Sequence, residues 1–337
     1  MKFAIIGLGR MGRRHIQVAQ SLGFDVVGVY DLFQGAVDET LNEFPMLKDK
    51  VFSSAEALLE QSGAQLLTVS TTAPSHAEFV CKAAESGFRY ILCEKPLAVS
   101  LAEADAMVVS CAQNGVQLAV NHQMQFMEQY TKIRDMIGSG EFGPLRSITV
   151  HASNFGLAMN AVHYFEMFRY VTGETLASVQ CWIDNEKVPN PRGPQYSDYS
   201  GQLRGLSASG VRLNLEAGGD LGHGIQVIYG CRNGQIIVDE LAGSVRAIRR
   251  KAEFTELPTT RYGMPVDVES FSIAPADVLE PTACVWRAML AGQSFPDGYV
   301  GQHALAVLVA AYISGEANAA LTAVDDSLPK QKTFSWA

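Results

Sequence analysis

Three glycines near the N-terminus, Gly7, Gly9 and Gly12, have the spacing G-x-G-x-x-G. Where such a turn joins a strand to a helix, the first glycine permits the tight turn and the second lets the backbone approach a pyrophosphate. The third lets the helix pack on the strand. The pyrophosphate then lies on the helix N-terminus, so Arg10 and Met11 are also predicted to contact it. Because glycine-rich turns are common, the spacing is informative only between a strand and a helix.

An aspartate, Asp31, follows the next β-type run at Val26–Tyr30. Its carboxylate could accept hydrogen bonds from both hydroxyls of a ribose and would repel a 2′-phosphate. Leu32 and Phe33 come next, so no Arg or Lys stands there to neutralise such a phosphate. The motif therefore predicts NAD as the cofactor, with NADP disfavoured. The alternative is an ordinary surface aspartate at the end of a strand.

Two further polar motifs follow β-type runs later in the chain. Residues 70–76 have the sequence Ser-Thr-Thr-Ala-Pro-Ser-His, and Glu94, Lys95 and Pro96 follow the run Tyr90–Cys93. A lysine beside a pyridinium cation would experience like-charge repulsion, which lowers its pKa towards a useful range. Its ammonium could also polarise a carbonyl or stabilise a developing alkoxide, and Glu94 would orient it. The alternative for Glu94 and Lys95 is a surface ion pair.

The elements around these motifs alternate between short β-type runs and helical patterns. Strands are predicted at 3–6, 26–30, 65–70, 90–93 and 117–120, and helices at 13–22, 55–61, 76–86 and 101–114. Alternation of this kind predicts an α/β fold with a parallel, doubly wound sheet of the Rossmann type.

After residue 120 the pattern changes to longer β-type runs punctuated by Gly and Asn, which are typical of a mixed or antiparallel sheet. The predicted elements are a helix to about 138, strands from 145 and between 178 and 250, and helices at 160–172, 280–291 and 301–321. We expect a dinucleotide-binding Rossmann domain at 1–121 and an α+β domain for substrate binding and oligomerisation at 122–337. The segment 188–201 is expected to be a long loop with a functional surface.

The composition excludes several classes of protein. The 337 residues are 47% hydrophobic and 18% charged, which fits two globular cores. The net charge of -9 argues against a nucleic-acid partner, and the longest apolar run, 304–313, is too short to span a bilayer. The six cysteines form no C-x-x-C pair and no zinc-like cluster. We therefore expect no metal site, no membrane partner and a reducing, cytoplasmic location.

Together, the glycine turn, the motif at 70–76 and Glu94-Lys95-Pro96 resemble the Gfo/Idh/MocA oxidoreductases, the family of glucose–fructose and inositol dehydrogenases. The resemblance covers nearly the whole chain. It implies an N-terminal Rossmann domain and a C-terminal domain with an open, largely antiparallel sheet that forms homodimers or homotetramers. It also implies that Lys95 lies beside the nicotinamide and the reacting hydroxyl, and that the Lys95–Pro96 peptide is cis.

The resemblance further implies which residues contact the cofactor beyond the glycine turn and Asp31. These are Ser70, Thr71, Thr72, Pro74, His76, Glu94, Lys95 and Asn121. Residues 121–126, Asn-His-Gln-Met-Gln-Phe, stand where many relatives have Arg-Arg-Phe. The loss of both arginines weakens any expectation of a carboxylate or phosphate contact from this loop. Asn121 or His122 could still contact the nicotinamide or a sugar hydroxyl.

The second catalytic element implied by the resemblance is a helix with the pattern D-x-x-x-H. His163 matches the histidine, but Met159 stands at the aspartate position, and Asn160 is the nearest polar residue. Residues three apart share a helix face, so Asn160 can neighbour His163. Asn160 can orient and hydrogen-bond, but it cannot ionise to hold the charge of a protonated histidine. Three alternatives stay open: His163 is the acid/base alone, Asn160 binds substrate directly, or activity has been lost.

These patterns lead to one main hypothesis and two alternatives. We expect an NAD-dependent oxidoreductase that transfers a hydride between a secondary hydroxyl or carbonyl of a sugar or cyclitol and the nicotinamide, with Lys95, His163 and Asn160 as catalytic residues. The first alternative uses a nucleotide sugar or an amino sugar of a surface-polysaccharide pathway. The second is a dinucleotide-binding regulator without catalysis. The remaining histidines singled out as structural are His15, His151, His223 and His303.

Overall fold

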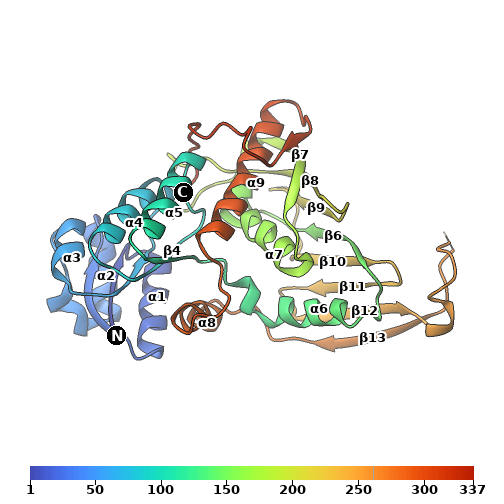
Figure 1. Ribbon diagram of the computed structural model, residues 1–337, viewed down its shortest axis with the longest axis horizontal. Helices are drawn as coiled ribbons and strands as arrows, with labels where there is room; N and C mark the ends of the chain where they lie inside the picture. The colour runs from blue at the N-terminus through green and yellow to red at the C-terminus, as the bar shows by residue number, and fades with distance from the viewer. Residues whose placement is uncertain (261) are drawn as a thin grey trace. The chain divides into compact units, whose positions relative to one another are not determined.

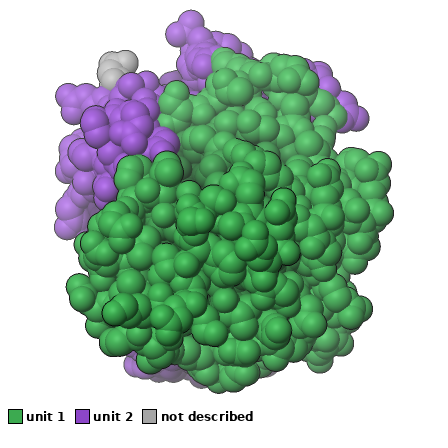
Figure 2. All heavy atoms as spheres, turned by 90° about the vertical axis from the view of Figure 1, so that its left-hand side faces the viewer, with its two compact units in different colours: residues 1–123, 278–305, 329–337 green, residues 124–277, 306–328 purple. Residues whose placement is uncertain are grey.

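The computed structural model describes residues 1–260 and 262–337 and divides into two compact units (Figures 1 and 2). The first unit contains residues 1–123, 278–305 and 329–337. The second contains residues 124–277 and 306–328. Each unit is built on a sheet of its own.

The first unit has a five-stranded parallel sheet with the strand order β2-β1-β3-β4-β5. Its strands are β1 (Lys2–Ile6), β2 (Asp25–Tyr30), β3 (Leu66–Val69), β4 (Tyr90–Cys93) and β5 (Gln117–Val120). Its helices are α1 (Arg10–Ser21), α2 (Gln34–Glu43), α3 (Ala55–Gln61), α4 (His76–Glu85), α5 (Leu101–Gln113) and α8 (Leu279–Leu290). The strand order reverses between β1 and β3, and open α/β sheets bind ligands at such a switch point.

The strands of this sheet form because almost all of their residues are apolar. All four residues of β3 are buried, as expected when helices cover both faces of a parallel sheet. Two of the helices begin at serine caps. Ser54 Oγ accepts a hydrogen bond from the Ala57 N–H at 3.1 Å, and Ser100 Oγ accepts one from the Glu103 N–H at 3.2 Å. Right-handed crossovers place α1 on one face and α3, α4 and α5 on the other.

The second unit has a nine-stranded sheet with the order β13-β12-β11-β10-β6-β9-β8-β7-β14. Neighbouring strands are antiparallel except β6 and β9. The strands are β6 (Leu145–His151), β7 (Leu176–Lys187), β8 (Tyr199–Ser207), β9 (Arg212–Ala217), β10 (Gln226–Cys231), β11 (Gly234–Asp239), β12 (Ser244–Arg250), β13 (Val266–Ser272) and β14 (Thr322–Ala323). The helices α6 (Glu128–Gly138) and α7 (Val162–Thr172) lie along this sheet (Figure 1), and α9 (Gly298–Glu316) ends in this unit.

One face of the nine-stranded sheet is covered and the other is open. Tyr229 on β10 is fully buried, and its hydroxyl lies 3.9 Å from Sδ of Met167 on α7, so α7 covers this face. On β8, by contrast, Gln202, Arg204 and Leu206 are exposed in alternation with buried residues. The expected fold class, a Rossmann sheet followed by an open and largely antiparallel sheet, is confirmed.

Two C-terminal segments, 278–305 and 329–337, fold with the first unit. The Trp336 indole N–H donates a hydrogen bond to the carbonyl oxygen of Ala98 at 2.9 Å, which anchors the last residues to the segment between β4 and α5. The division expected from the sequence placed everything after residue 121 in a second domain, so the structure differs there. Hydrophobic periodicity identifies a helix, but it does not say which surface the helix covers.

Some local boundaries also differ from the expectations. Where a helix was expected at 160–172, α7 begins at Val162 and follows a π-helical turn, Leu157–Ala161. The helix α2 was not predicted.

Within residues 1–260 and 262–337, no helix is long and apolar enough to cross a membrane. In the same ranges, no group of three or more His, Cys, Asp or Glu could hold a metal ion, and all six cysteines are free.

Trp286 on α8 tests the assignment of this helix to the first unit. Its side chain is fully buried, with its ring centroid 6.0 Å from that of Phe3 and 5.8 Å from that of Phe24. We expect Trp286→Ala to lower the free energy of unfolding of this unit by about 3–5 kcal/mol, because a cavity replaces a large apolar side chain. Urea denaturation would measure the loss as a lower midpoint at an unchanged m-value.

A matched control for this prediction is Tyr299→Ala. Tyr299 is 64% exposed on α9, so the loss of its ring should change the free energy of unfolding by less than about 0.5 kcal/mol. Equal losses in the two variants would contradict the packing of α8 described above.

Candidate functional site

The residues predicted to bind the cofactor come from five segments of the first unit, each of which follows the carboxyl end of a strand and two of which include the first residues of a helix. They are Gly7, Gly9, Arg10, Met11 and Gly12 after β1, Asp31 after β2, Ser70, Thr71, Thr72, Pro74 and His76 after β3, Glu94 and Lys95 after β4, and Asn121 after β5. The strands of a parallel sheet all end at one edge. Residues that are far apart in the sequence are therefore gathered there.

The structure gives a different physical reason for glycine at each of the three positions of this turn. Gly7 has a φ of 96°, which residues with a side chain rarely adopt, and its N–H donates to the Tyr30 carbonyl at 2.9 Å. A Cβ on Gly12 would overlap the carbonyl oxygen of Gly7. A Cβ on Gly9 would meet no atom of the described residues within 4 Å, so the backbone is open on that side.

The N-terminus of α1 presents backbone donors towards this open side. Gly9 is the N-cap residue, and within the described part of the chain no side chain caps α1 and no acidic residue lies in its first turn. The amides of Arg10, Met11 and Gly12 therefore stand at the positive end of the helix dipole. The open backbone at Gly9 and these amides together fit a pyrophosphate.

Asp31 is fixed by two backbone donors. Its Oδ2 accepts a hydrogen bond from the Leu8 N–H at 2.6 Å, and its Oδ1 accepts one from the Phe33 N–H at 2.8 Å. Each carboxylate oxygen has a second lone pair, so Asp31 can still accept from ribose hydroxyls. Its negative charge beside the glycine turn also disfavours a 2′-phosphate.

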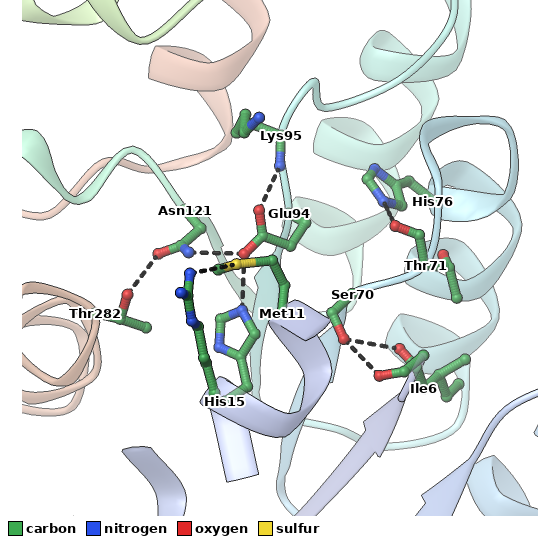
Figure 3. A network of polar contacts seen from close by, with 12 residues as sticks. Ile6, Met11, His15, Ser70, Thr71, His76, Glu94, Lys95, Asn121 and Thr282 are labelled. Atoms are coloured by element: carbon green, nitrogen blue, oxygen red, sulfur yellow. Dashed lines mark hydrogen bonds and ion pairs between the residues drawn. The ribbon is translucent and has the colours of Figure 1, made fainter. Parts of the chain in front are cut away.

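The loop after β3 supports the glycine turn. The Ser70 hydroxyl donates to the Gly7 carbonyl oxygen at 2.7 Å, which joins the ends of β1 and β3 at the switch point. Figure 3 shows Ser70 beside Ile6, whose carbonyl oxygen lies 3.5 Å from the same hydroxyl. Thr72 and Pro74 lie further along, where the short 3₁₀ helix Ala73–Ser75 begins. Ser70 therefore holds the shape of the turn, while the direct cofactor contacts of this loop stay a prediction.

His76 is buried, and its ring nitrogens contact backbone carbonyl oxygens of two loops. Nδ1 lies 3.1 Å and 3.2 Å from the carbonyl oxygens of Pro96 and Leu97, and Nε2 lies 3.2 Å from that of Thr71. Burial lowers the pKa of His76, although the surrounding carbonyls favour its charged form. His76 thus connects the loop after β3 to the Lys95–Pro96 turn, whose peptide bond is cis as expected.

Glu94 lies at the centre of a buried polar network (Figure 3). Its Oε1 accepts a hydrogen bond from Asn121 Nδ2 at 2.8 Å and lies 2.8 Å from His15 Nε2. Its Oε2 accepts from the Lys95 N–H at 3.3 Å, and Asn121 Oδ1 accepts from the Thr282 hydroxyl at 3.4 Å. Burial alone would raise the pKa of Glu94. The His15 hydrogen bond and the charges of His15 and Lys95 hold that pKa well below its usual range.

Two members of this network, His15 and Thr282, were not predicted as site residues. The sequence analysis gave His15 a structural role only and did not name Thr282. One signal was available, because His15 lies on the stripe of α1 that carries Gly12 and Ala19, both buried. A polar residue on the buried stripe of a helix needs a hydrogen-bonding partner in the core.

The second unit contains the other two predicted catalytic residues. Asn160 lies in the π-helical turn Leu157–Ala161, and His163 lies in the first turn of α7, which follows directly. Both side chains are half-buried. Single π-helical turns within α-helices are frequent at functional sites. Lys95 belongs to the first unit, whereas Asn160 and His163 belong to the second.

Comparisons with known proteins agree with this geometry. Residues 1–122 match the model of the oxidoreductase family with an NAD-binding Rossmann fold. The chain is 25% identical to the inositol 2-dehydrogenase of Serratia proteamaculans (strain 568), over 94% of this chain and 95% of that protein. It is 26% identical to the scyllo-inositol 2-dehydrogenase (NAD(+)) of Bacillus subtilis (strain 168), over 72% of this chain and 74% of that protein.

Solved structures share the fold across both units. An oxidoreductase from Agrobacterium radiobacter, solved in complex with NAD+, L-tartaric acid and magnesium, superposes with a TM-score of 0.81 at 16% identity. The superposition covers 97% of this chain and 99% of that one. Residues 1–122, which contain the glycine turn and the Glu94-Lys95-Pro96 motif, are therefore an NAD-binding Rossmann domain of the Gfo/Idh/MocA oxidoreductase type.

Proposed function

We propose that this protein is an NAD-dependent dehydrogenase that oxidises a secondary hydroxyl of a sugar or cyclitol, or reduces the corresponding carbonyl. The observation that carries the proposal is the position of Lys95 in the turn after β4, where its backbone N–H donates to the buried carboxylate of Glu94, in a unit that fits a dinucleotide. The inositol dehydrogenases among the relatives support a polyhydroxylated substrate. A nucleotide sugar or amino sugar, and an inactive regulator, are the alternatives that no observation favours.

Bound NAD supplies the carbon that accepts the hydride from the substrate. We assign Lys95 to the proton of the reacting hydroxyl, because a neutral amine can accept that proton and an ammonium can stabilise the alkoxide that develops. Glu94 is held ionised, because the His15 hydrogen bond and the charges of His15 and Lys95 keep its pKa well below its usual range. His15 and Asn121 hold the Glu94 carboxylate and so fix this charge in place.

We propose different roles for the two units. The first holds the cofactor, through the loops at the carboxyl ends of its strands. The second selects the substrate, with His163 as a further acid–base group and Asn160 as a neutral group that can both donate and accept hydrogen bonds. An amide suits a substrate rich in hydroxyls. A cytoplasmic location is also part of this proposal, supported by the six free cysteines.

We further propose that the open face of the nine-stranded sheet joins subunits into a homodimer or homotetramer. Trp182 on β7 lies opposite Gln202 on β8, so it shares the open face with Arg204 and Leu206. Trp182 is 56% exposed and Leu206 is 41% exposed. Large apolar side chains among polar ones on an exposed surface are typical of subunit contacts.

Sedimentation velocity tests the subunit contact. We expect the wild-type protein to sediment as a dimer or tetramer, and the double variant Trp182→Glu with Leu206→Glu to shift towards monomer, because two charges would be buried without partners. The control Leu257→Glu, at a position that is 45% exposed outside the sheet, should leave the assembly intact. A wild-type monomer would contradict the proposal.

Two alanine variants of the glycine turn separate cofactor binding from folding. Gly12→Ala should lower the stability of the first unit by about 1–3 kcal/mol, because its Cβ overlaps the Gly7 carbonyl. Gly9→Ala should leave the melting temperature unchanged, because its backbone angles, φ −63° and ψ −170°, suit any residue. The Kd for NADH should nevertheless rise at least about tenfold, or about 1.4 kcal/mol.

Both quantities can be measured directly, by thermal melts and by NADH fluorescence titration. If Gly9→Ala binds NADH as tightly as the wild-type protein, the pyrophosphate does not lie over the Gly9 backbone.

Lys95→Ala tests the assigned chemistry. On a panel of sugars, cyclitols and nucleotide sugars, its turnover should fall by about 10²–10⁴-fold, the range expected when a general acid–base group is removed. Its Kd for NADH should stay within about tenfold of the wild-type value. The matched control is Lys82→Ala on α4, where the lysine is 41% exposed and pairs with Glu56 and Glu78.

The outcomes of this experiment are distinct. Full turnover in Lys95→Ala would show that the assignment of the lysine is wrong. NADH binding without turnover of any compound by the wild-type protein would favour the regulator.

A further inference from the structure

A buried carboxylate, Asp198, holds the backbone just ahead of α7. Its Oδ1 accepts a hydrogen bond from the Ala158 N–H at 3.0 Å, and its Oδ2 accepts one from the Met159 N–H at 2.8 Å. Oδ1 also accepts from the Tyr312 hydroxyl at 3.0 Å and from the Tyr199 N–H at 2.9 Å. Asp198 is only 1% exposed, so these four donors replace the water that the carboxylate loses.

The two helix amides that Asp198 binds are at the start of the π-helical turn Leu157–Ala161. Amides in the first turn of a helix have no partner within the helix, and a carboxylate there also interacts favourably with the helix dipole. Asp198 comes from the far end of the loop between β7 and β8. The loop that was expected to form a functional surface therefore provides an anchor for this turn.

The absence of a side chain at Gly156 leaves room for the Asp198 carboxylate. Gly156 has φ −87° and ψ 157°, angles that any residue can adopt, so its conformation does not require glycine. A Cβ at this position would, however, overlap Oδ2 of Asp198. The adjacent Phe155 carbonyl accepts a hydrogen bond from the Ser200 hydroxyl at 2.9 Å, which is a second tie to β8.

The turn that Asp198 anchors has an unusual hydrogen-bond pattern. The carbonyl of Gly156 accepts from the Asn160 N–H at 3.0 Å and from the Ala161 N–H at 3.2 Å, which makes the turn wider than that of an α-helix. The width of this turn determines the direction in which Asn160 projects relative to His163, the second residue of α7.

We propose that Asp198 is a positioning residue for Asn160 and His163, which it orients by fixing the wide turn before α7. The proposal rests on the function proposed above for these two residues. Asp198 acts on the backbone of the turn and is not a catalytic residue. It therefore differs from the aspartate of a D-x-x-x-H helix, whose side chain would stand on the helix itself.

Three variants separate this role from general stability. Asp198→Asn puts an N–H group against a backbone N–H, because an amide has only one acceptor oxygen. Gly156→Ala displaces the carboxylate without changing it, and so carries the test if the asparagine variant does not fold. The matched control is Tyr312→Phe, which removes one donor to Asp198 but leaves the bonds from Ala158 and Met159.

The first measurement is steady-state kinetics at a temperature where each variant is folded. We expect kcat to fall by about 10–100-fold in Asp198→Asn and Gly156→Ala, because a small misplacement of an acid–base group has effects of this size. The Kd for NADH in these variants, and kcat in Tyr312→Phe, should stay within about threefold of wild type. In a background that carries both Asn160→Ala and His163→Ala, Asp198→Asn should cause no further loss of kcat. A full further loss would overturn the proposal, because Asp198 would then act independently of both residues.

The second measurement needs no turnover. The imidazole resonance of His163, identified by its absence from His163→Ala, should shift or broaden in Asp198→Asn and stay unchanged in Tyr312→Phe. An unchanged resonance in Asp198→Asn would overturn the proposal whatever the kinetics. If the resonance moves but the wild-type protein turns over no compound, the positioning role stands and the proposed dehydrogenase function falls.

Discussion

The buried carboxylate of Glu94 is the constraint on which the first unit's site depends. An ionised carboxylate inside a protein is costly unless donors replace the water it loses. Here the donors are His15 of α1, Asn121 after β5 and the backbone of Lys95, and Asn121 in turn accepts from Thr282 of α8. Because all of them must reach one group, α1, α8 and the ends of β4 and β5 keep a fixed arrangement. The glycine turn at the start of α1 and the lysine after β4 are held together in this way.

The buried carboxylates of the second unit are held differently. Glu240, directly after β11, accepts hydrogen bonds from the hydroxyls of Tyr130 on α6 and Tyr164 on α7, and Asp198 accepts mainly from backbone amides. Burial raises the pKa of both groups. It acts on Glu94 in the same direction, but there the His15 hydrogen bond and the neighbouring positive charges outweigh it and lower the pKa. Glu94 therefore supplies a permanent negative charge to its site. Glu240 and Asp198 instead fix geometry, by joining helices to the sheet.

The sequence was sufficient to predict those parts of the candidate site that lie within a single loop. The glycine turn, Asp31 and Lys95 follow the carboxyl ends of strands, as the predicted strands imply, and a parallel sheet brings these ends to one edge. The pairing of His15 with Glu94 joins residues 79 positions apart, and it depends on how α1 packs on the sheet. Asp198 was missed for the same reason, since a loop has no periodicity that says what its side chains reach. That α8 belongs to the first unit could likewise not be predicted from hydrophobic periodicity, because it depends on how the helix packs.

The π-helical turn before α7 lacks the charged residue that the family pattern has four residues before the histidine. Met159 replaces the expected aspartate, and its backbone N–H is bound by Asp198. The Asp198 carboxylate is surrounded by donors from the backbone and from a tyrosine, so its negative charge holds the backbone before α7 in place. Asn160, the polar neighbour of His163 in sequence, is neutral and cannot hold a protonated imidazole by charge. The Glu-Lys-Pro motif is retained, so an ionised carboxylate follows β4 next to Lys95 in the sequence, whereas Met159 stands at the aspartate position of the helix. Proton transfer should depend more heavily on the lysine than on the histidine.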